Sequence, residues 1–327
     1  MNEVRWERMF PDQLEEAFQR CPLIYFPYGL CEPHGPQNTL GLDALKAQRV
    51  ACETALAFGG IVAPTDFWHI HELGGYAVWG AKYVGEIKRK WLTSVPPWVH
   101  FKNVCYHVRT ADVLGFHAAI FLTGHYGPNW EDLKTLLARL QPYTKTRLYG
   151  LPDFEANQPG FDSDHHSGGD HAGKVETSLL WALEPTCVDI SRLPEAVRQG
   201  GAASGAHFQA TTKPGEVPPR EGIDVVAAAP HFAVGSNVMQ SSRTIGERMV
   251  QDEVRWIAAK AQSLLAAYDP NADAPGLPTF ESVELFWEKE IQPILPQFRS
   301  MSLDFGLGEA VDPQSVWYPN WAVPQRR

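Results

Sequence analysis

The sequence LIYFPYGLCEPHGPQNTLGLD, residues 23–43, places a run of apolar residues directly before a group of polar ones. The run from Leu23 to Tyr28 predicts a buried strand, and Glu32 and His34 come shortly after it. The proline and the glycine on either side of His34 interrupt the strand, so both polar side chains can converge beyond its end. A carboxylate and an imidazole at the end of a strand are typical of a metal site.

Asp43 supplies a second carboxylate at the beginning of the next predicted helix. We expect this helix over residues 44–58, where a Gly-Gly pair ends it. The Asp43 side chain would then return to the point that Glu32 and His34 reach. This stretch alone leaves two interpretations open: a metal site, or a helix N-cap aspartate with two solvated loop residues.

Two further strand-to-helix junctions carry candidate ligands. The run AAIFLT, residues 118–123, predicts a buried parallel strand that leads directly to His125. The sequence DHAGKVETS, residues 170–178, places His171 and Glu176 where a small-residue loop becomes a helix. Such junctions lie along one edge of an open α/β sheet, which is where these folds bind their ligands.

The three motifs together resemble the creatininase (creatinine amidohydrolase) family, which includes formamide-hydrolysing deformylases and a peptide-trimming member. The similarity consists of Glu-x-His-Gly-Pro with a later Gly-x-Asp, a Gly-His-Tyr turn, and His-Ala-Gly-x-x-Glu-Thr-Ser, in that order. It extends from about residue 23 to 193 and resumes weakly over residues 232–265. The tail beyond Tyr268 resembles no part of the family.

The resemblance implies a ligand set for one or two divalent metal ions. Glu32, Asp43 and His125 would bind one ion, while His34 and the shared Asp43 would bind a second. Carboxylate and imidazole ligands without a thiolate suit Zn, Mn or Fe(II). A pair of ions bridged by one carboxylate can activate a water and polarise the carbonyl that it attacks, without a serine or cysteine nucleophile.

The chain departs from creatininase proper after the Gly-His-Tyr turn, where that enzyme has a ligating glutamate and this chain has Gly127. Because of this departure, the sequence does not decide whether a second metal binds or whether creatinine is the substrate. Glu176 is the candidate replacement, either as a ligand or as a group that acts on the activated water from behind the ligands. His171 matches the catalytic imidazole of the family, and a histidine that holds no metal suits proton donation to the leaving nitrogen.

Residues near the same sheet edge are candidates for contact with a substrate. We assign Tyr126, His71 and Trp68 to this role. For His71 a structural histidine is an equally good interpretation, and aromatic residues in α/β proteins are more often part of the core.

The alternation of apolar and amphipathic segments predicts the fold class. A chain of 327 residues with 44% hydrophobic content can bury a large core. We predict an α/β fold with a doubly wound, mostly parallel sheet flanked by helices. Further strands are expected at residues 61–64, 146–149 and 224–229, and further helices at residues 101–114, 130–140, 176–183, 244–268 and 282–290.

We predict a hydrolase domain at residues 1–268 and a helical, proline-rich extension at residues 269–327. A long loop at residues 200–220 would serve as a lid or as a contact between subunits. The extension is rich in large apolar residues, which need a partner surface on the parent domain or on a neighbouring subunit. With the resemblance, this density predicts a homo-oligomer, most simply a hexamer with tails that cross a subunit boundary.

The amino-acid composition argues against some classes of binding partner. The formal net charge of -10 argues against a nucleic-acid or anionic-membrane partner. No apolar run approaches the length of a membrane span, and the charged N-terminal segment does not resemble a signal peptide. Five cysteines without metal-type spacing are expected to be reduced thiols in the cytoplasm.

We therefore expect a metal-dependent hydrolase that opens the C–N bond of a non-peptide amide, cyclic amide or formamide in a small-molecule substrate. Alternatives that keep the metal are a lactonase, a small-peptide peptidase and an isomerase. A non-catalytic scaffold with a degenerate site is the alternative that Gly127 suggests, although His171 and Glu176 argue against it.

Overall fold

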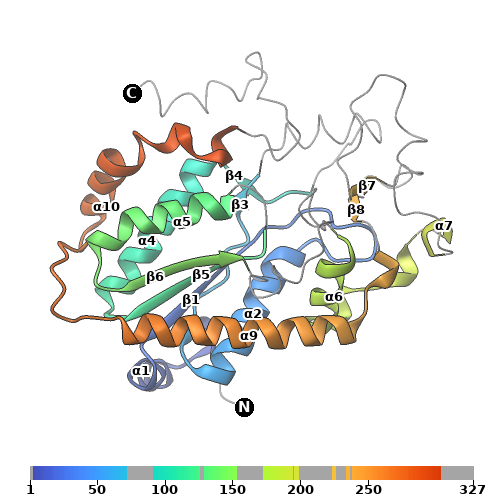
Figure 1. Cartoon of the computed structure of the whole chain (residues 1–327), viewed down its shortest axis with the longest axis horizontal. Coiled ribbons are helices and arrows are strands. Elements are labelled where there is room, and N and C mark those ends of the chain that lie inside the picture. The colour runs from blue at the N-terminus through green and yellow to red at the C-terminus, as the bar shows by residue number, and fades with distance from the viewer. Residues whose placement is uncertain are drawn as a thin grey trace.

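A parallel sheet forms the centre of the molecule. The computed structural model describes residues 3–71, 91–125, 129–152, 172–193, 195–198, 223–225, 233–235 and 238–302. Within these residues, four parallel strands lie in the order β2-β1-β5-β6, of which Figure 1 labels β1, β5 and β6. The strands are β1 (Leu23–Tyr28), β2 (Ile61–Val62), β5 (Ala118–Thr123) and β6 (Arg147–Pro152). The chain passes from β1 to β2 on one side and later to β5 on the other, so the strand order reverses between β1 and β5.

Both faces of the sheet are buried, which explains the continuous apolar runs of β1 and β5. Successive side chains alternate between two hydrophobic cores: Phe26 and Phe121 belong to one, and Tyr25 and Ile120 to the other.

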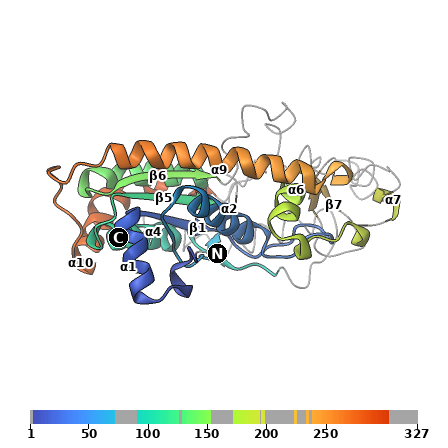
Figure 2. The same cartoon turned by 90° about the horizontal axis from the view of Figure 1, so that it is seen from below.

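Helices cover the sheet on both faces (Figure 1). Helices α4 (Pro97–Val113) and α5 (Asn129–Leu140) supply the core of one face, and α2 (Leu42–Phe58) and α9 (Arg243–Ala266) that of the other. Helix α6 (Lys174–Leu183) lies beside the beginning of α9 (Figure 2). The two helices can approach closely because Gly246 has no side chain. A Cβ at this position would lie 1.8 Å from the carbonyl oxygen of Ser178. The predicted doubly wound α/β fold is confirmed.

Shorter elements complete the described part of the chain. β3 (His69–Ile70) pairs in parallel with β4 (Ser94–Val95), and β7 (Ile223–Val225) pairs antiparallel with β8 (Ala233–Gly235). The remaining helices are α1 (Pro11–Arg20), α7 (Glu195–Arg198), α10 (Phe280–Phe286) and a π-helical turn at Trp287–Ile291. Short 3₁₀ turns lie at Trp6–Arg8, Gln141–Tyr143, Pro185–Cys187, Ile190–Arg192, Val238–Gln240, Leu295–Gln297 and Arg299–Ser302.

The two long apolar runs form strands with the predicted bounds. Helix α4 begins four residues before the prediction, because Pro97 suits the first position of a helix. The helix predicted at residues 282–290 begins at Phe280 and changes to π-helical geometry after Phe286. Of the strand predicted at 224–229, residues 226–229 lie outside the described part, as does the loop at 200–220.

The C-terminal extension packs on its own domain as far as the structure describes it. Phe298 meets Phe101 of α4 edge to face with ring centroids 5.2 Å apart. The backbone N–H of Ser300 donates to the buried carboxylate of Asp132 in α5 over 2.7 Å. The sequence left two surfaces open for the extension, the parent domain and a neighbouring subunit. Residues 280–302 pack on the parent domain. Residues 303–327 lie outside the description, so a tail that crosses a subunit boundary stays a prediction.

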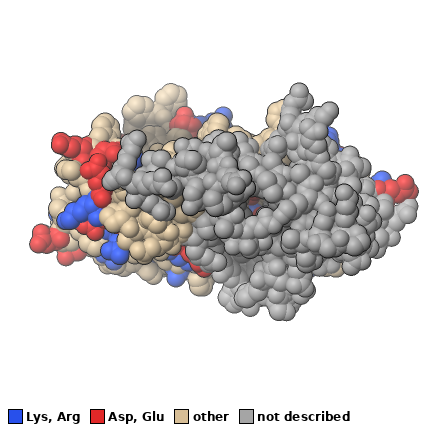
Figure 3. Space-filling model, turned by 90° about the horizontal axis from the view of Figure 1, so that it is seen from above, with Lys and Arg blue, Asp and Glu red and all other residues tan. Residues whose placement is uncertain are grey.

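The surface of the described residues carries charges of both signs. Acidic and basic side chains are interspersed on the described part of the face in Figure 3. Among the described helices, none has the length and apolar character to cross a membrane.

Candidate metal centre

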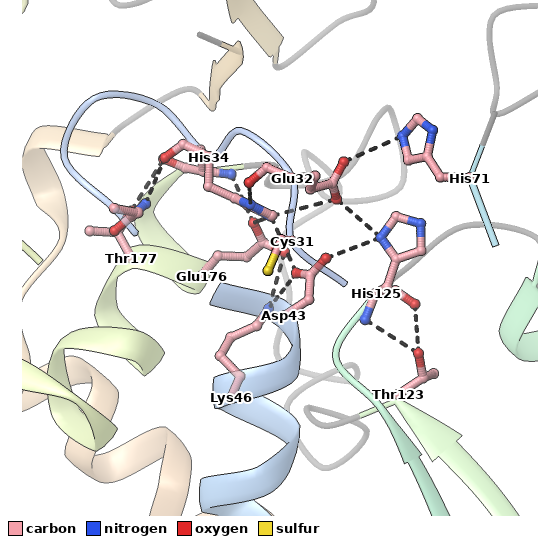
Figure 4. A network of polar contacts seen from close by, with 12 residues as sticks. Cys31, Glu32, His34, Asp43, Lys46, His71, Thr123, His125, Glu176 and Thr177 are labelled. Carbon is pink, nitrogen blue, oxygen red and sulfur yellow. Dashed lines mark hydrogen bonds and ion pairs between the residues drawn. The ribbon is translucent and has the colours of Figure 1, made fainter. Parts of the chain in front are cut away.

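Five buried side chains meet at the edge of the sheet where the strand order reverses (Figure 4). This is the place where open α/β sheets bind ligands. Glu32 and His34 follow β1, His125 follows β5, Asp43 is the second residue of α2, and Glu176 is the third residue of α6. All five predicted ligands are thus brought together. Asp43 lies within α2, and Gly41 occupies the N-cap position, so the alternative of an N-cap aspartate is wrong.

Two glycines allow the strand ends to approach the first turn of α2. A Cβ on Gly29 would lie 2.3 Å from the backbone nitrogen of Ala44. A Cβ on Gly124 would lie 2.0 Å from the carbonyl oxygen of Asp43. Any larger residue at either position would push α2 away from the strand ends. The closeness of Asp43 to His125 therefore depends on Gly124.

The ligand atoms form two groups that share Asp43. In the first group, Nδ1 of His125 lies 3.1 Å from Oε1 of Glu32 and 3.1 Å from Oδ2 of Asp43. In the second group, Nε2 of His34 lies 3.2 Å from Oδ1 of Asp43 and 3.5 Å from Oε2 of Glu176. Asp43 directs one carboxylate oxygen to each group, as expected of a residue that bridges two sites.

The carboxylates strongly perturb the two imidazoles. Burial favours neutral His34, but Asp43, Glu176 and Glu32 outweigh it and raise the pKa of His34 to about 9. Burial likewise opposes charge on His125, yet Glu32 and Asp43 raise its pKa to about 10. Burial also opposes charge on Asp43, but His34 and His125 hold its pKa below the usual value. In the absence of another cation, protons on the imidazoles compensate the carboxylates.

Hydrogen bonds behind the cluster orient the ligand atoms. Nδ1 of His34 is 3.0 Å from the backbone carbonyl of Glu32, so it carries the proton of a neutral ring and leaves the Nε2 lone pair facing Asp43. The backbone N–H of Ala172 donates to Oε2 of Glu176 over 2.8 Å. Ala172 adopts a φ of 55°, a left-handed conformation that is costly for alanine and common at functional sites.

A second chain of hydrogen bonds fixes the backbone at His125. Nδ1 of His69 accepts from the N–H of Ile70 over 2.7 Å, so its Nε2 donates to the hydroxyl of Thr123 over 3.2 Å. The Thr123 hydroxyl in turn donates to the carbonyl of His125 over 3.0 Å. Burial first, and then His100, keep the pKa of His69 well below its usual value, which suits this neutral role.

Lys46 is a member of the cluster that the sequence analysis did not single out. It is fully buried, and its Nζ lies 3.1 Å from Oε1 of Glu176 and 4.0 Å from Oδ1 of Asp43 (Figure 4). The available signal was the spacing of Asp43 and Lys46, which places them on one face of a helix three residues apart. The pairing with Glu176, 130 residues further along the chain, was not visible.

The other predicted site residues have different outcomes. Nε2 of His71 lies 3.3 Å from Oε2 of Glu32, at the margin of the cluster. The side chain of Trp68 is exposed and has no polar contact with the cluster in the described part of the structure. Tyr126, Gly127 and His171 lie outside the described residues.

The donor set fits a divalent cation. Among the described residues of the cluster, three buried carboxylates and one ammonium leave two negative charges, and burial of uncompensated charge is costly. The Nε2 lone pair of a neutral His34 would face carboxylate oxygens unless a proton or a cation lay between them. Nε2 of His125 is buried with no hydrogen-bond partner among the described residues. A cation at either group would contact imidazole and carboxylate atoms together, as Zn, Mn and Fe(II) prefer.

Comparisons with known proteins identify the family and the fold. The sequence model of the family described as "Creatininase: Creatinine amidohydrolase" matches residues 7–261. A search of curated protein sequences gives no match. A solved creatinine amidohydrolase (creatininase) is 20% identical, with a TM-score of 0.57 over 83% of this chain and 100% of that one.

Two further solved structures have the same fold. A protein provisionally assigned as a creatinine amidohydrolase from Bacteroides fragilis NCTC 9343 is 19% identical, with a TM-score of 0.59 over 83% of this chain and 99% of that one. A structure described as "Creatininase Mn" is 21% identical, with a TM-score of 0.55 over 82% of this chain and 100% of that one.

Proposed function

The chain belongs to the creatininase family, and from this premise we propose that it is a metal-dependent hydrolase of a non-peptide amide, cyclic amide or formamide. The observation that carries the proposal is the pair of buried ligand groups sharing Asp43. The manganese named for one structural relative and the zinc named for another support a divalent ion as the cofactor. We propose Zn, Mn or Fe, with a small-molecule substrate.

The residues around the first ligand group have proposed tasks. Glu32, Asp43 and His125 would hold the ion of this group. When bound, the ion supplies a Lewis acid that polarises a carbonyl and makes water nucleophilic near neutral pH. Burial of the ligands keeps bulk water away and strengthens their attraction for the ion. Glu176, held by Lys46 and by the N–H of Ala172, has a fixed orientation beside the reacting groups.

Cleavage of a C–N bond also requires a proton for the leaving nitrogen. We propose that His171 donates it, by the similarity of His-Ala-Gly-x-x-Glu-Thr-Ser to the family motif. Ala172, the next residue, is tied through its N–H to Glu176 and through its carbonyl to Gln37, whose amide nitrogen donates over 2.9 Å. These bonds support a fixed position of the backbone next to His171.

The metal content of the purified protein tests the proposal. We expect wild-type protein to retain divalent metal after dialysis and to hydrolyse members of an amide panel. Chelation should abolish turnover, and Zn or Mn should restore it. Asp43→Asn should remove a ligand of both groups and abolish metal retention.

Asp132→Asn is the matched control, because Asp132 is another buried carboxylate and contacts Ser300 of the extension instead of the cluster. It should lower stability and keep the metal. A wild-type protein that binds no divalent ion on titration, or an Asp43→Asn variant with unchanged affinity, would remove the basis of the proposal.

We also propose that the chain forms a homo-oligomer, with a hexamer as the expected state. The proposal rests on the family resemblance. Mass measurement in solution at micromolar concentration tests it, and a strict monomer would contradict it.

A further inference from the structure

A lysine is an unexpected neighbour for a pair of metal sites. Lys46 is fully buried and contributes its ammonium to the carboxylates of Glu176 and Asp43, at 3.1 Å and 4.0 Å. Both carboxylates belong to the second ligand group, together with His34. The first ligand group meets Asp43 at the other carboxylate oxygen, Oδ2, whereas Lys46 lies nearest Oδ1.

We infer that Lys46 supplies the positive charge that a second metal ion would supply, so that this centre holds one tightly bound divalent ion, at Glu32, Asp43 and His125. The inference rests on the proposed function and specifies the number of ions in the same centre. It makes Lys46 a positioning residue, which acts through Glu176 and Asp43.

The charge balance supports this assignment. With neutral imidazoles, the described charged residues of the centre, Glu32, Asp43, Glu176 and Lys46, together carry two negative charges, which one divalent ion neutralises. A second divalent ion would leave a buried excess of positive charge. The lysine thus makes the second ion unfavourable without removing any ligand atom of the second group.

The geometry adds a direct repulsion. An ion bound to Oδ1 of Asp43 and Oε2 of Glu176 would contact the same two carboxylates that Lys46 contacts. Like charges that share ligands in a buried site repel strongly because little water screens them. Oε1 of Glu176 accepts from Lys46 and Oε2 accepts from the N–H of Ala172, so both oxygens that could bind a second ion already accept a hydrogen bond.

Metal titration of Lys46 variants tests the inference. Wild-type protein, stripped of metal and titrated with Zn or Mn in a calorimeter, should bind one ion tightly. Lys46→Met keeps the length of the side chain and removes the charge. It should bind a second ion at least about tenfold more tightly than wild type does, because the repulsion is lost. Elemental analysis after dialysis should then approach two ions per chain.

Three further variants control the experiment. Lys46→Gln also lacks the charge but can still hydrogen bond to Glu176, so it should behave like Lys46→Met even if the methionine variant does not fold. Lys46→Arg retains the charge and should still bind one ion. Lys102→Met removes a lysine that pairs with Glu284 at 2.8 Å, away from the cluster, and should also bind one ion.

The outcomes separate the inference from the proposed function. Two ions of similar affinity in wild-type protein would overturn the inference and leave a metal-dependent hydrolase intact. A single ion in Lys46→Met and Lys46→Gln, with only reduced stability, would assign Lys46 a purely structural role and overturn it as well. Protein that binds no divalent ion at all would instead contradict the proposed function.

Discussion

Gly124 and the carbonyl oxygen of Asp43 are so close that a Cβ built on the glycine would lie 2.0 Å from that oxygen. Gly124 is the first residue after β5, and Asp43 is in the first turn of α2. The contact therefore fixes the distance between the turn that carries His125 and the helix that carries the shared carboxylate. The two proposed ligands meet because no side chain stands between their backbones.

Replacement of Gly124 by alanine should separate these elements. The methyl group cannot be accommodated without movement of α2, so we expect a loss of stability of about 3 kcal/mol or more and a weakened metal site. Chemical denaturation and metal titration measure the two effects. Gly41→Ala is the control, because the nearest atom to its Cβ is 3.5 Å away, and it should cost about 1 kcal/mol or less. Equal effects of the two variants would contradict this interpretation.

The hydroxyl of Thr123 links His69 to the backbone of His125. Thr123→Val keeps the shape and removes the link, so the backbone that carries the His125 imidazole should lose its fixed position. We expect metal affinity to fall by roughly 10–100-fold, the usual effect of losing a group behind a metal ligand. Thr54→Val removes a buried hydroxyl that bonds to Val50 inside α2 and should leave the affinity unchanged. Unchanged affinity in Thr123→Val would show that the link is dispensable.

Substitution of His171 should affect turnover but not metal content, whereas substitution of a metal ligand should affect both. His171→Ala should keep the metal and lower kcat by about 10²–10⁴-fold, the usual contribution of a general acid or base. Elemental analysis and steady-state kinetics on the same sample provide the measurement. Loss of metal in this variant would make His171 a ligand and would refute its assignment as the proton donor.

The buried His100 should make the fold sensitive to acid. Burial, and then the nearby His107 and His125, lower the pKa of His100 to about 3. A folded-state pKa below that of the unfolded chain means that the unfolded state binds the extra proton. Above about pH 6.5 this histidine does not change the free energy of unfolding. Below that pH it lowers the free energy of unfolding by about 1.4 kcal/mol per pH unit as the pH decreases toward 4.

The variant His100→Phe removes this titrating group and keeps an aromatic ring. Its free energy of unfolding, measured in chelator at several pH values, should decrease less steeply below pH 6.5 than that of wild type. Parallel curves for the two proteins would show that His100 does not titrate on unfolding as expected.

The sequence was sufficient to predict the strands that are marked by an uninterrupted apolar run and the candidate ligands that directly follow them. The runs at residues 23–28 and 118–123 are apolar without interruption because both sheet faces are buried, and each leads to a ligand at its carboxyl end. The helix at Pro11–Arg20 was not predicted, although Leu14, Ala17 and Phe18 recur at helical spacing and pack against the core, because its other residues are mostly polar or charged. Strands β3 and β4 have two residues each, which is too short for any period to be visible.

Contacts between distant segments could not be predicted in the same way. The pairing of Lys46 with Glu176 depends on how α6 lies against α2, and no spacing in the sequence encodes that arrangement. The apolar density of the extension indicated that it needs a surface, but only the packing against α4 and α5 identifies that surface for residues 280–302.

That packing predicts the result of truncating the chain. The described part of the extension buries eight apolar side chains in the core shared with α4 and α5: Leu277, Val283, Phe286, Trp287, Ile291, Leu295, Phe298 and Met301. Burial of each contributes about 1.5–3 kcal/mol, and the sum is comparable with the total stability of a domain, about 5–15 kcal/mol. Truncation after Tyr268 should therefore prevent stable folding, whereas truncation after Ser302 should leave a folded chain.

Mass measurement of the chain that ends at Ser302 then tests the role of the final segment. If residues 303–327 cross a subunit boundary, their removal should lower the oligomeric state while thermal stability at low protein concentration changes little. An unchanged oligomer would assign the assembly to surfaces of residues 1–302. A folded, stable chain that ends at Tyr268 would instead contradict the contribution of the extension to the core.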